Sequence, residues 1–212
     1  MKYQNIQQKS ASPLANQPQL NLLQQDICLP AVILKHSALQ HNLQWMQNFA
    51  DASGVLLAPH GKTSMTPWLF QQQLATGAWG ITVATPYQAQ VAVQAGAKRL
   101  ILANQLVGKA NMAVIATLLA SGNEIYVCID NIDNASALSA FFSAEGLCLP
   151  VLIELGVPGG RCGCRTNQQA VELAQQLVTL PGLSLAGVEF YEGVIKSADT
   201  ARSVRQFVQQ AA

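Results

Sequence analysis

The chain contains 212 residues, half of them apolar, which is enough for one sizeable hydrophobic core or two small ones. Twelve lysines and arginines against eleven aspartates and glutamates leave a net charge of +1. This balance excludes a strongly basic nucleic-acid-binding surface and a strongly acidic tail. The high apolar content, together with a charged fraction of only 11%, also excludes an intrinsically disordered chain.

Signals for membrane insertion and export are missing from the pattern of apolar residues. The longest apolar stretch, residues 112–120, is much shorter than the roughly 18 residues that a membrane-spanning helix needs. The first five residues, Met-Lys-Tyr-Gln-Asn, lead into no apolar segment, so they do not begin a signal peptide. The five cysteines, an odd number, indicate reduced thiols. We therefore expect a cytoplasmic protein with no membrane or nucleic-acid partner.

Residues 1–26 are rich in Gln and Asn and lack periodicity, which predicts an N-terminal arm. From residue 27 onward, short apolar runs typical of strands alternate with segments of helical periodicity. The runs that predict strands are residues 31–34, 55–58, 81–84, 100–103, 125–129, 151–154 and 185–190. Expected N-caps of the helices between them are Ser37, Thr66, Thr85, Asn134 and Thr166, and expected C-terminal glycines are Gly77, Gly96, Gly122 and Gly146.

This alternation predicts an α/β fold built on a parallel sheet. Six β/α units in a row with no dinucleotide-binding fingerprint favour the (β/α)8 TIM-type barrel over a doubly wound sheet. Six strands cannot close the hydrogen-bond ladder of such a barrel. We therefore expect residues 27–212 to form an incomplete barrel, present either as part of a larger domain or as an open sheet.

Active sites of β/α barrels lie at the carboxyl ends of the strands, where this sequence places several reactive side chains. Lys62 follows the run 55–58, and partial desolvation there would favour the neutral amine that forms a Schiff base. Arg161 follows a Gly-Gly pair, and Tyr191 ends the run 185–190. On position alone, each of these three residues is also compatible with an ordinary surface side chain.

Other polar residues at the strand ends carry weaker signals. His60 and Asn104 are candidates for a pocket wall, whereas Asp130 and Glu154 are as compatible with fixing loops as with acting on a substrate. The close pair Cys162 and Cys164 supplies too few ligands for a zinc site. We therefore expect no metal ligand within these 212 residues.

Five ordered segments of the chain resemble the fold-type III pyridoxal-phosphate enzymes, which include alanine racemase. The segments are residues 39–46, 58–63 (Ala-Pro-His-Gly-Lys-Thr), 77–85, 102–108 (Leu-Ala-Asn-Gln-Leu-Val-Gly) and 154–163 (Glu-Leu-Gly-Val-Pro-Gly-Gly-Arg-Cys-Gly), and residues 187–193 agree as well. The resemblance covers roughly residues 28–196 and is greatest to the branch that holds D-serine deaminases and D-threonine aldolases.

The resemblance implies a pyridoxal 5'-phosphate cofactor and a small D-amino acid substrate. Lys62 and Tyr191 would be the catalytic residues: Lys62 would bind the cofactor covalently and serve as a base, and Tyr191 would lie near the ring or the substrate. Arg161 would contact the phenolic oxygen of the cofactor, and His60 and Asn104 would line the pocket. The implied reaction is the α,β-elimination of D-serine, with retro-aldol cleavage or racemisation as alternatives.

Enzymes of this group also contain two more barrel strands and a C-terminal β-domain, which supply much of the phosphate site and, in the lyases, a divalent metal. None of those segments is among these residues, so we expect the chain alone to be inactive and the full-length enzyme to be a homodimer. A non-catalytic pyridoxal-phosphate-binding carrier protein, built from one barrel without a β-domain, is the alternative of another class.

Overall fold

The computed structural model describes residues 21–211 of the chain, which divides into two units, residues 1–40 and 41–212. In the first unit the described part contains the short 3-10 helix η1 (Leu22–Gln24) and the start of helix α1 (His36–Ala52). The expectation of a strand at residues 31–34 is wrong. This segment is irregular, and its Val32 side chain is 97% exposed, because no strand lies beside it among residues 21–40. The expected arm, residues 1–26, falls mostly outside the described residues.

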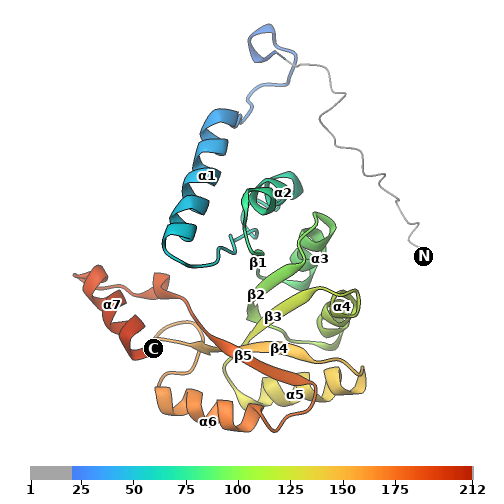
Figure 1. Ribbon diagram of the computed structural model, residues 1–212, viewed down its shortest axis with the longest axis vertical. Coiled ribbons are helices and arrows are strands. Elements are labelled where there is room, and N and C mark those ends of the chain that lie inside the picture. The colour runs from blue at the N-terminus through green and yellow to red at the C-terminus, as the bar shows by residue number, and fades with distance from the viewer. Residues whose placement is uncertain (1–20, 212) are drawn as a thin grey trace. The chain divides into compact units, whose positions relative to one another are not determined.

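The second unit alternates helices and strands, as Figure 1 shows. After α1 come α2 (Pro67–Thr76), β1 (Ile81–Val83), α3 (Pro86–Gln94), β2 (Arg99–Gln105), α4 (Lys109–Ala120), β3 (Glu124–Ile129), α5 (Ile132–Ala144), β4 (Leu149–Leu155), α6 (Asn167–Leu177), β5 (Leu183–Phe190), the 3-10 helix η2 (Glu192–Val194) and α7 (Thr200–Ala211). None of the described helices is long and apolar enough to cross a membrane.

The five strands form one parallel sheet in the order β1-β2-β3-β4-β5, which is their order along the chain. A doubly wound sheet would reverse direction at a switch point, whereas successive right-handed crossovers in one direction place all the helices on one face. Helices α3, α4, α5 and α6 accordingly lie together along one side of the strands (Figure 1). Since β1 and β5 do not pair with each other, the described strands form an open part of a barrel, which confirms the predicted class.

The segment at residues 55–58 does not form the strand that its sequence predicts. It runs beside β1 without a regular ladder: Trp79 N–H donates to the Leu57 carbonyl at 2.8 Å, and a single parallel bridge joins His60 to Thr82. Because β1 is only three residues long, it offers too few donors and acceptors to pair with the whole segment. The segment still occupies the place of a first strand, next to β1.

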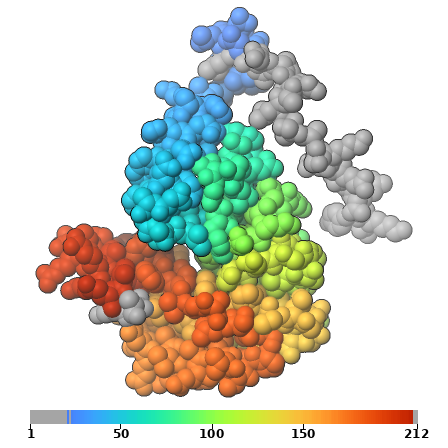
Figure 2. Space-filling view, viewed as in Figure 1, coloured from blue at the N-terminus to red at the C-terminus, as the bar shows by residue number. Residues whose placement is uncertain are grey.

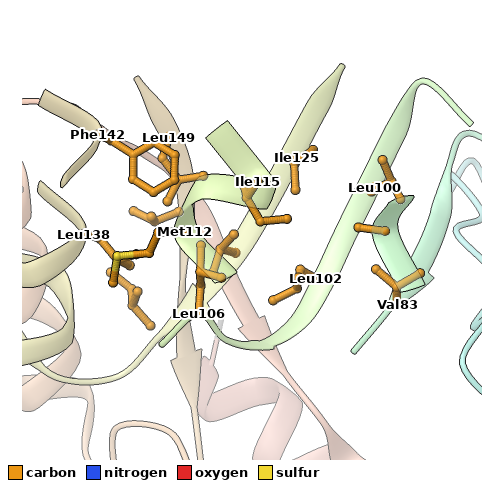
Figure 3. Close-up of a cluster of buried hydrophobic side chains, with 14 of the residues drawn as sticks. Val83, Leu100, Leu102, Leu106, Met112, Ile115, Ile125, Leu138, Phe142 and Leu149 are labelled. Atoms are coloured by element: carbon orange, nitrogen blue, oxygen red, sulfur yellow. The ribbon is translucent and has the colours of Figure 1, made fainter. Parts of the chain in front are cut away.

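The hydrophobic core lies between the sheet and its helices. Alternate residues of the strands, including Val83, Leu102, Ile125 and Val127, are fully buried and belong to one apolar cluster with side chains from α3, α4 and α5. Figure 3 shows this layer, in which Phe142 of α5 and Leu149 of β4 lie against each other and next to residues from α4. The green-to-orange part of the chain, from α3 to β5, forms one continuous packed surface in Figure 2.

Side-chain caps fix where several helices begin. Thr85 and Thr166 each accept a hydrogen bond from the backbone N–H three residues later, as expected for N-caps. Asn134 is not the cap of α5: Asn131 takes that role and accepts from the Asn134 N–H at 2.8 Å. Thr66 precedes α2, but its hydroxyl donates to the Ser64 carbonyl and makes no cap bond.

Candidate active site

The carboxyl ends of the parallel strands share one edge of the sheet, and the candidate side chains follow those ends. Lys62 lies beyond the segment beside β1, Asn104 lies near the end of β2, Arg161 lies in the loop after β4, and Tyr191 directly follows β5. Parallel strands of a barrel bring such residues to one rim even though they are far apart in sequence.

Three contacts fix the backbone next to Lys62. The Gly61 N–H donates to the Thr82 carbonyl at 2.7 Å, and the Thr82 N–H donates to the Pro59 carbonyl at 2.8 Å. Gly61 itself is buried, and a Cβ there would lie 2.7 Å from the Phe70 ring and 3.1 Å from Ile81. Glycine is therefore required before Lys62, because only a residue without a side chain allows this close approach. The Lys62 side chain, one position further, is exposed.

Arg161 and Tyr191 contact each other at the carboxyl ends of β4 and β5. The Arg161 guanidinium carbon lies 4.7 Å from the centre of the Tyr191 ring, a cation–π contact. The ring is 42% exposed and lies so close to Gly193 that a Cβ there would overlap its phenol group. The contact joins the loop after β4 to the segment after β5.

His60 links Lys62 to Arg161 electrostatically. Burial lowers the pKa of His60 below its usual 6.5, and the positive charges of Lys62 and then Arg161 lower the pKa further. These causes require both cations to lie near the imidazole. His60 is therefore neutral at pH 7, with one nitrogen free to accept a hydrogen bond and the other free to donate one. Of the five sequence-predicted residues, Arg161 and Tyr191 are in direct contact, and Lys62 and Arg161 lie within electrostatic range of His60.

Asn104 has a different setting. Its side-chain amide donates to the Ala84 carbonyl at 3.1 Å, and its oxygen accepts from the Gln105 N–H at 2.9 Å. The first of these bonds connects the end of β2 to the end of β1, and the second lies within β2. Its hydrogen-bonding groups thus hold the rim of the sheet together, and its side chain is exposed beside them.

A cluster of thiols and carboxylates lies on the face of the sheet opposite the helices, and sequence analysis missed it. Cys128 of β3, Glu154 of β4 and Glu189 of β5 place their ligand-type atoms within 4.8 Å of one another. Cys162 donates to Glu154 at 2.7 Å, and Cys128 contacts Glu189 at 3.8 Å. These atom types are ones that hold metal ions, and here the thiols donate to the carboxylates.

Burial in this cluster shifts the pKa of its members upward. Burial, and then the negative charge of Glu154, raise the pKa of Glu189 to about 7. Burial and the hydrogen bond to Glu154 raise the pKa of the Cys162 thiol to about 11. Burial likewise raises the pKa of Cys128. Since Arg161 opposes the rise at both Glu189 and Cys162, its positive charge lies near the cluster as well as near His60.

Asp130, a residue that the sequence left undecided, fixes the loop that carries Arg161. Its carboxylate accepts from the Gly163 N–H at 2.8 Å and from the Gln105 side chain. A pocket of about 540 Å³ lies against the same loop, lined by residues that include Val157, Arg165 and Phe207. None of the sequence-predicted site residues lines this pocket.

Comparisons with known proteins relate the chain to enzymes that act on D-amino acids. D-threonine aldolase from an Arthrobacter species is 35% identical over 183 residues, which cover 86% of this chain and 48% of that enzyme. The 3-hydroxy-D-aspartate aldolase of Paracoccus denitrificans (strain Pd 1222) is 29% identical over 177 residues, which cover 82% of this chain and 46% of that enzyme. The chain thus spans about half the length of the curated relatives it matches.

Solved structures give the same picture for the fold. D-threonine aldolase from Filomicrobium marinum superposes with a TM-score of 0.80 at 30% identity, covering 88% of this chain and 52% of that one. D-threo-3-hydroxyaspartate dehydratase from Delftia sp. HT23 superposes with a TM-score of 0.75 at 26% identity, covering 85% of this chain and 48% of that one. The family described as alanine racemase, N-terminal domain, matches residues 34–212, and the chain belongs to this family.

Proposed function

We propose that this chain is the barrel part of a pyridoxal-phosphate-dependent lyase that cleaves D-amino acids carrying a hydroxyl group on the β carbon. The observation that supports this most is the grouping of a primary amine, a neutral imidazole and a guanidinium at the carboxyl ends of the strands. Lys62, His60 and Arg161 form this group, and Arg161 extends it to Tyr191.

The charges of this group fit the cofactor. Pyridoxal phosphate is an anionic aldehyde, so it needs an amine for its carbonyl carbon and cations for its oxygens. Lys62 supplies the amine, and Lys62 and Arg161 both place positive charge beside His60. A guanidinium keeps its proton at any physiological pH, which suits it to holding an ionised ring oxygen.

Each residue would then have a separate task. Lys62 would hold the cofactor covalently and be released by substrate. In the elimination its neutral amine would then take the proton from the α carbon, whereas in aldol cleavage the bond between the α and β carbons breaks instead. Arg161 would orient the cofactor through its ring oxygen, and Tyr191 would keep the guanidinium in place from the other side. Neutral His60 would offer hydrogen bonds without adding a third positive charge. When bound, the cofactor supplies an electron sink for negative charge at the α carbon.

The names of the relatives limit the substrate class. They comprise two aldolases, for D-threonine and 3-hydroxy-D-aspartate, and a dehydratase for D-threo-3-hydroxyaspartate. All three substrates are D-amino acids with a β-hydroxyl group, as D-serine is. Elimination of water from such a substrate, followed by hydrolysis of the resulting enamine, yields a 2-oxo acid and ammonia, whereas retro-aldol cleavage yields glycine and an aldehyde. We propose the shared substrate class, with D-serine deamination and D-threonine cleavage as its two candidate reactions.

Covalent trapping tests the cofactor assignment. The purified chain is mixed with pyridoxal phosphate, reduced with borohydride and digested, and the labelled peptide is identified by mass spectrometry. We expect the label on Lys62 and its loss in Lys62→Ala. Lys98→Ala and Lys109→Ala, which remove lysines outside the candidate site, are matched controls that should keep the label. A label that remains on another lysine in Lys62→Ala would contradict the assignment.

Product analysis tests the reaction. Because the chain alone is expected to be inactive, the full-length protein that contains it is loaded with cofactor and incubated with D-serine, D-threonine and D-threo-3-hydroxyaspartate, and ammonia, 2-oxo acids, glycine and aldehydes are measured. Ammonia with a 2-oxo acid identifies elimination, and glycine with an aldehyde identifies aldol cleavage. Cofactor trapped on Lys62 without turnover of any of the three substrates would favour the non-catalytic carrier instead.

A further inference from the structure

The loop between β4 and α6 is held from inside by one side chain, Arg165. Its Nη1 donates to the Val157 carbonyl at 3.0 Å and to the Cys162 carbonyl at 2.7 Å. Its Nη2 donates to the Gly160 carbonyl at 2.9 Å. The loop from Val157 to Cys162 therefore wraps around one guanidinium, which satisfies three backbone acceptors that helices and strands leave unpaired.

The base of this loop is closed by other bonds, so Arg165 acts on its upper part. Gly156 N–H donates to the Cys164 carbonyl at 2.9 Å, and Gly163 N–H donates to Asp130 at 2.8 Å. A Cβ on Gly156 would overlap the Arg165 guanidinium, which shows how closely the backbone approaches it. The ends of the loop would remain joined without Arg165, whereas residues 157–162 would lose their shared partner.

Arg161 lies between two of the three carbonyls that Arg165 binds, those of Gly160 and Cys162. Its own side chain is exposed, and its guanidinium contacts the Tyr191 ring. The direction in which the Arg161 guanidinium extends thus depends on the backbone on either side of it. Both flanking carbonyls are fixed by the same neighbouring guanidinium.

We propose that Arg165 is a positioning residue that holds Arg161 over Tyr191 and beside His60, a role that rests on the proposed function of Arg161 in cofactor binding. Arginine suits this role because its planar fork presents five donors at fixed angles. A lysine at position 165 would keep the positive charge, but a single ammonium cannot replace two nitrogens that point at three carbonyls. The role therefore depends on the shape of the side chain as well as on its charge.

The pKa of His60 reports the position of Arg161 in the chain without any cofactor, so this test is independent of the proposed reaction. Burial and the charges of Lys62 and Arg161 lower that pKa, and Arg165 is not among the causes. The His60 ring protons are followed by NMR during a pH titration, after assignment with His60→Gln. We expect Arg165→Ala and Arg165→Lys each to raise the His60 pKa as much as Arg161→Ala does. The double variant R161A/R165A should raise it no further, since both changes remove the same charge from the same place.

Arg99→Ala serves as the matched control, because it removes a cation that forms an exposed ion pair with Glu124 at 3.2 Å, and it should leave the His60 pKa unchanged. Circular dichroism establishes that each variant is folded, and R165K carries the test if R165A unfolds. A folded Arg165 variant with the wild-type His60 pKa, alongside R161A with a raised one, would overturn the proposal. So would additive shifts in R161A/R165A, because they would show that Arg165 acts on His60 by a route other than Arg161.

Discussion

The two faces of the same strands differ in composition and in exposure. The face toward the helices carries Val127 and Ile129 in β3 and Ile153 in β4, all 2% exposed or less and part of one apolar cluster. Their immediate neighbours on the opposite face, Cys128 and Glu154, are as buried but bear a thiol and a carboxylate. Consecutive residues of one strand thus alternate between an apolar layer on the helix-facing side and titratable side chains on the opposite face.

This difference separates stability from chemistry. Burying large apolar side chains provides the favourable free energy of folding, and the helix-facing side holds nearly all of them. Buried thiols and carboxylates instead reduce stability unless they are hydrogen-bonded to each other, as they are here. Substitutions on the two faces should therefore have different magnitudes and a different dependence on pH.

The largest expected effect is on the helix-facing side of β4. Ile153→Ala should lower the free energy of unfolding by about 2–5 kcal/mol, because a fully enclosed side chain leaves a cavity. Leu152→Ala removes a side chain of the same size from the next position, which is only half-buried on the other face, so we expect a loss of about 1 kcal/mol. Urea denaturation measures both values. Equal losses would show that the two faces contribute alike.

Glu189 should give the next largest effect, and one that depends on pH. Its pKa is about 7 in the folded chain and 4.5 when unperturbed, so the folded state retains a proton that the unfolded state releases. Stability therefore falls as the pH rises from 4.5 to 7 and is constant above that range. Glu189→Gln resembles the protonated acid, so its free energy of unfolding should not fall over this pH range. After discounting for partial exposure, the variant should gain about 1–2 kcal/mol over the wild type between pH 5 and pH 8.

The control for this pH effect is Glu124→Gln, which removes an exposed carboxylate at the start of β3. It should change the free energy of unfolding by the same small amount at both pH values. If the effect of Glu189→Gln on the free energy of unfolding were as small and as independent of pH as that of the control, the face of the sheet opposite the helices would be as well solvated as the surface.

Local pattern predicted much of the fold but not the pairing of every run. The run 125–129 became β3 because neighbouring strands lie on both sides of it. The similar run 31–34 is β-branched and apolar, yet it is exposed and irregular, since propensity alone does not supply a partner. The segment at 55–58 is an intermediate case: it has a neighbouring strand, β1, but that strand is too short to form a regular ladder with it.

For the site, residues that belong to a recognisable motif could be named in advance, whereas residues that depend on strand register could not. Lys62 and Arg161 stand in such motifs, and they still require the trapping and titration experiments. The proximity of Glu189 to Glu154 follows from an irregularity between β4 and β5, where Val151 pairs with Leu185 but Leu152 pairs with Gly187. The extra residue shifts the register by one position, and nothing in the sequence announces it.

A smaller effect is expected at the start of α6, which packs on the helix-facing side of β4 and follows Arg165. Thr166 accepts a hydrogen bond from the Gln169 N–H at 3.1 Å, so Thr166→Ala should lower the free energy of unfolding by about 1 kcal/mol. Thr66→Ala is the matched control, because that hydroxyl makes no cap bond. Thermal denaturation of both variants measures the difference, and equal losses would argue against the cap.

The smallest effect on overall stability should come from Thr82, on the opposite face of β1 from its buried neighbours Ile81 and Val83. Its hydroxyl donates to the Ala58 carbonyl at 2.7 Å. This hydrogen bond is one of the few that hold the segment before Lys62. Thr82→Val keeps the shape and removes the donor. We expect a loss of about 0.5–1 kcal/mol, because Ala58 is only half-buried and water can replace the hydroxyl.

The loss of stability caused by Thr82→Val should nevertheless be concentrated in the segment just before Lys62. Hydrogen exchange of the Gly61 amide, which is bonded to the Thr82 carbonyl, should accelerate in Thr82→Val by more than the amides of β3 do. Local opening of this kind would let Lys62 move while the apolar layer stays intact, so the same variant should also be labelled less efficiently in the borohydride experiment. Uniform acceleration across β3 and Gly61 would instead mean that the segment before Lys62 opens only when the whole sheet does.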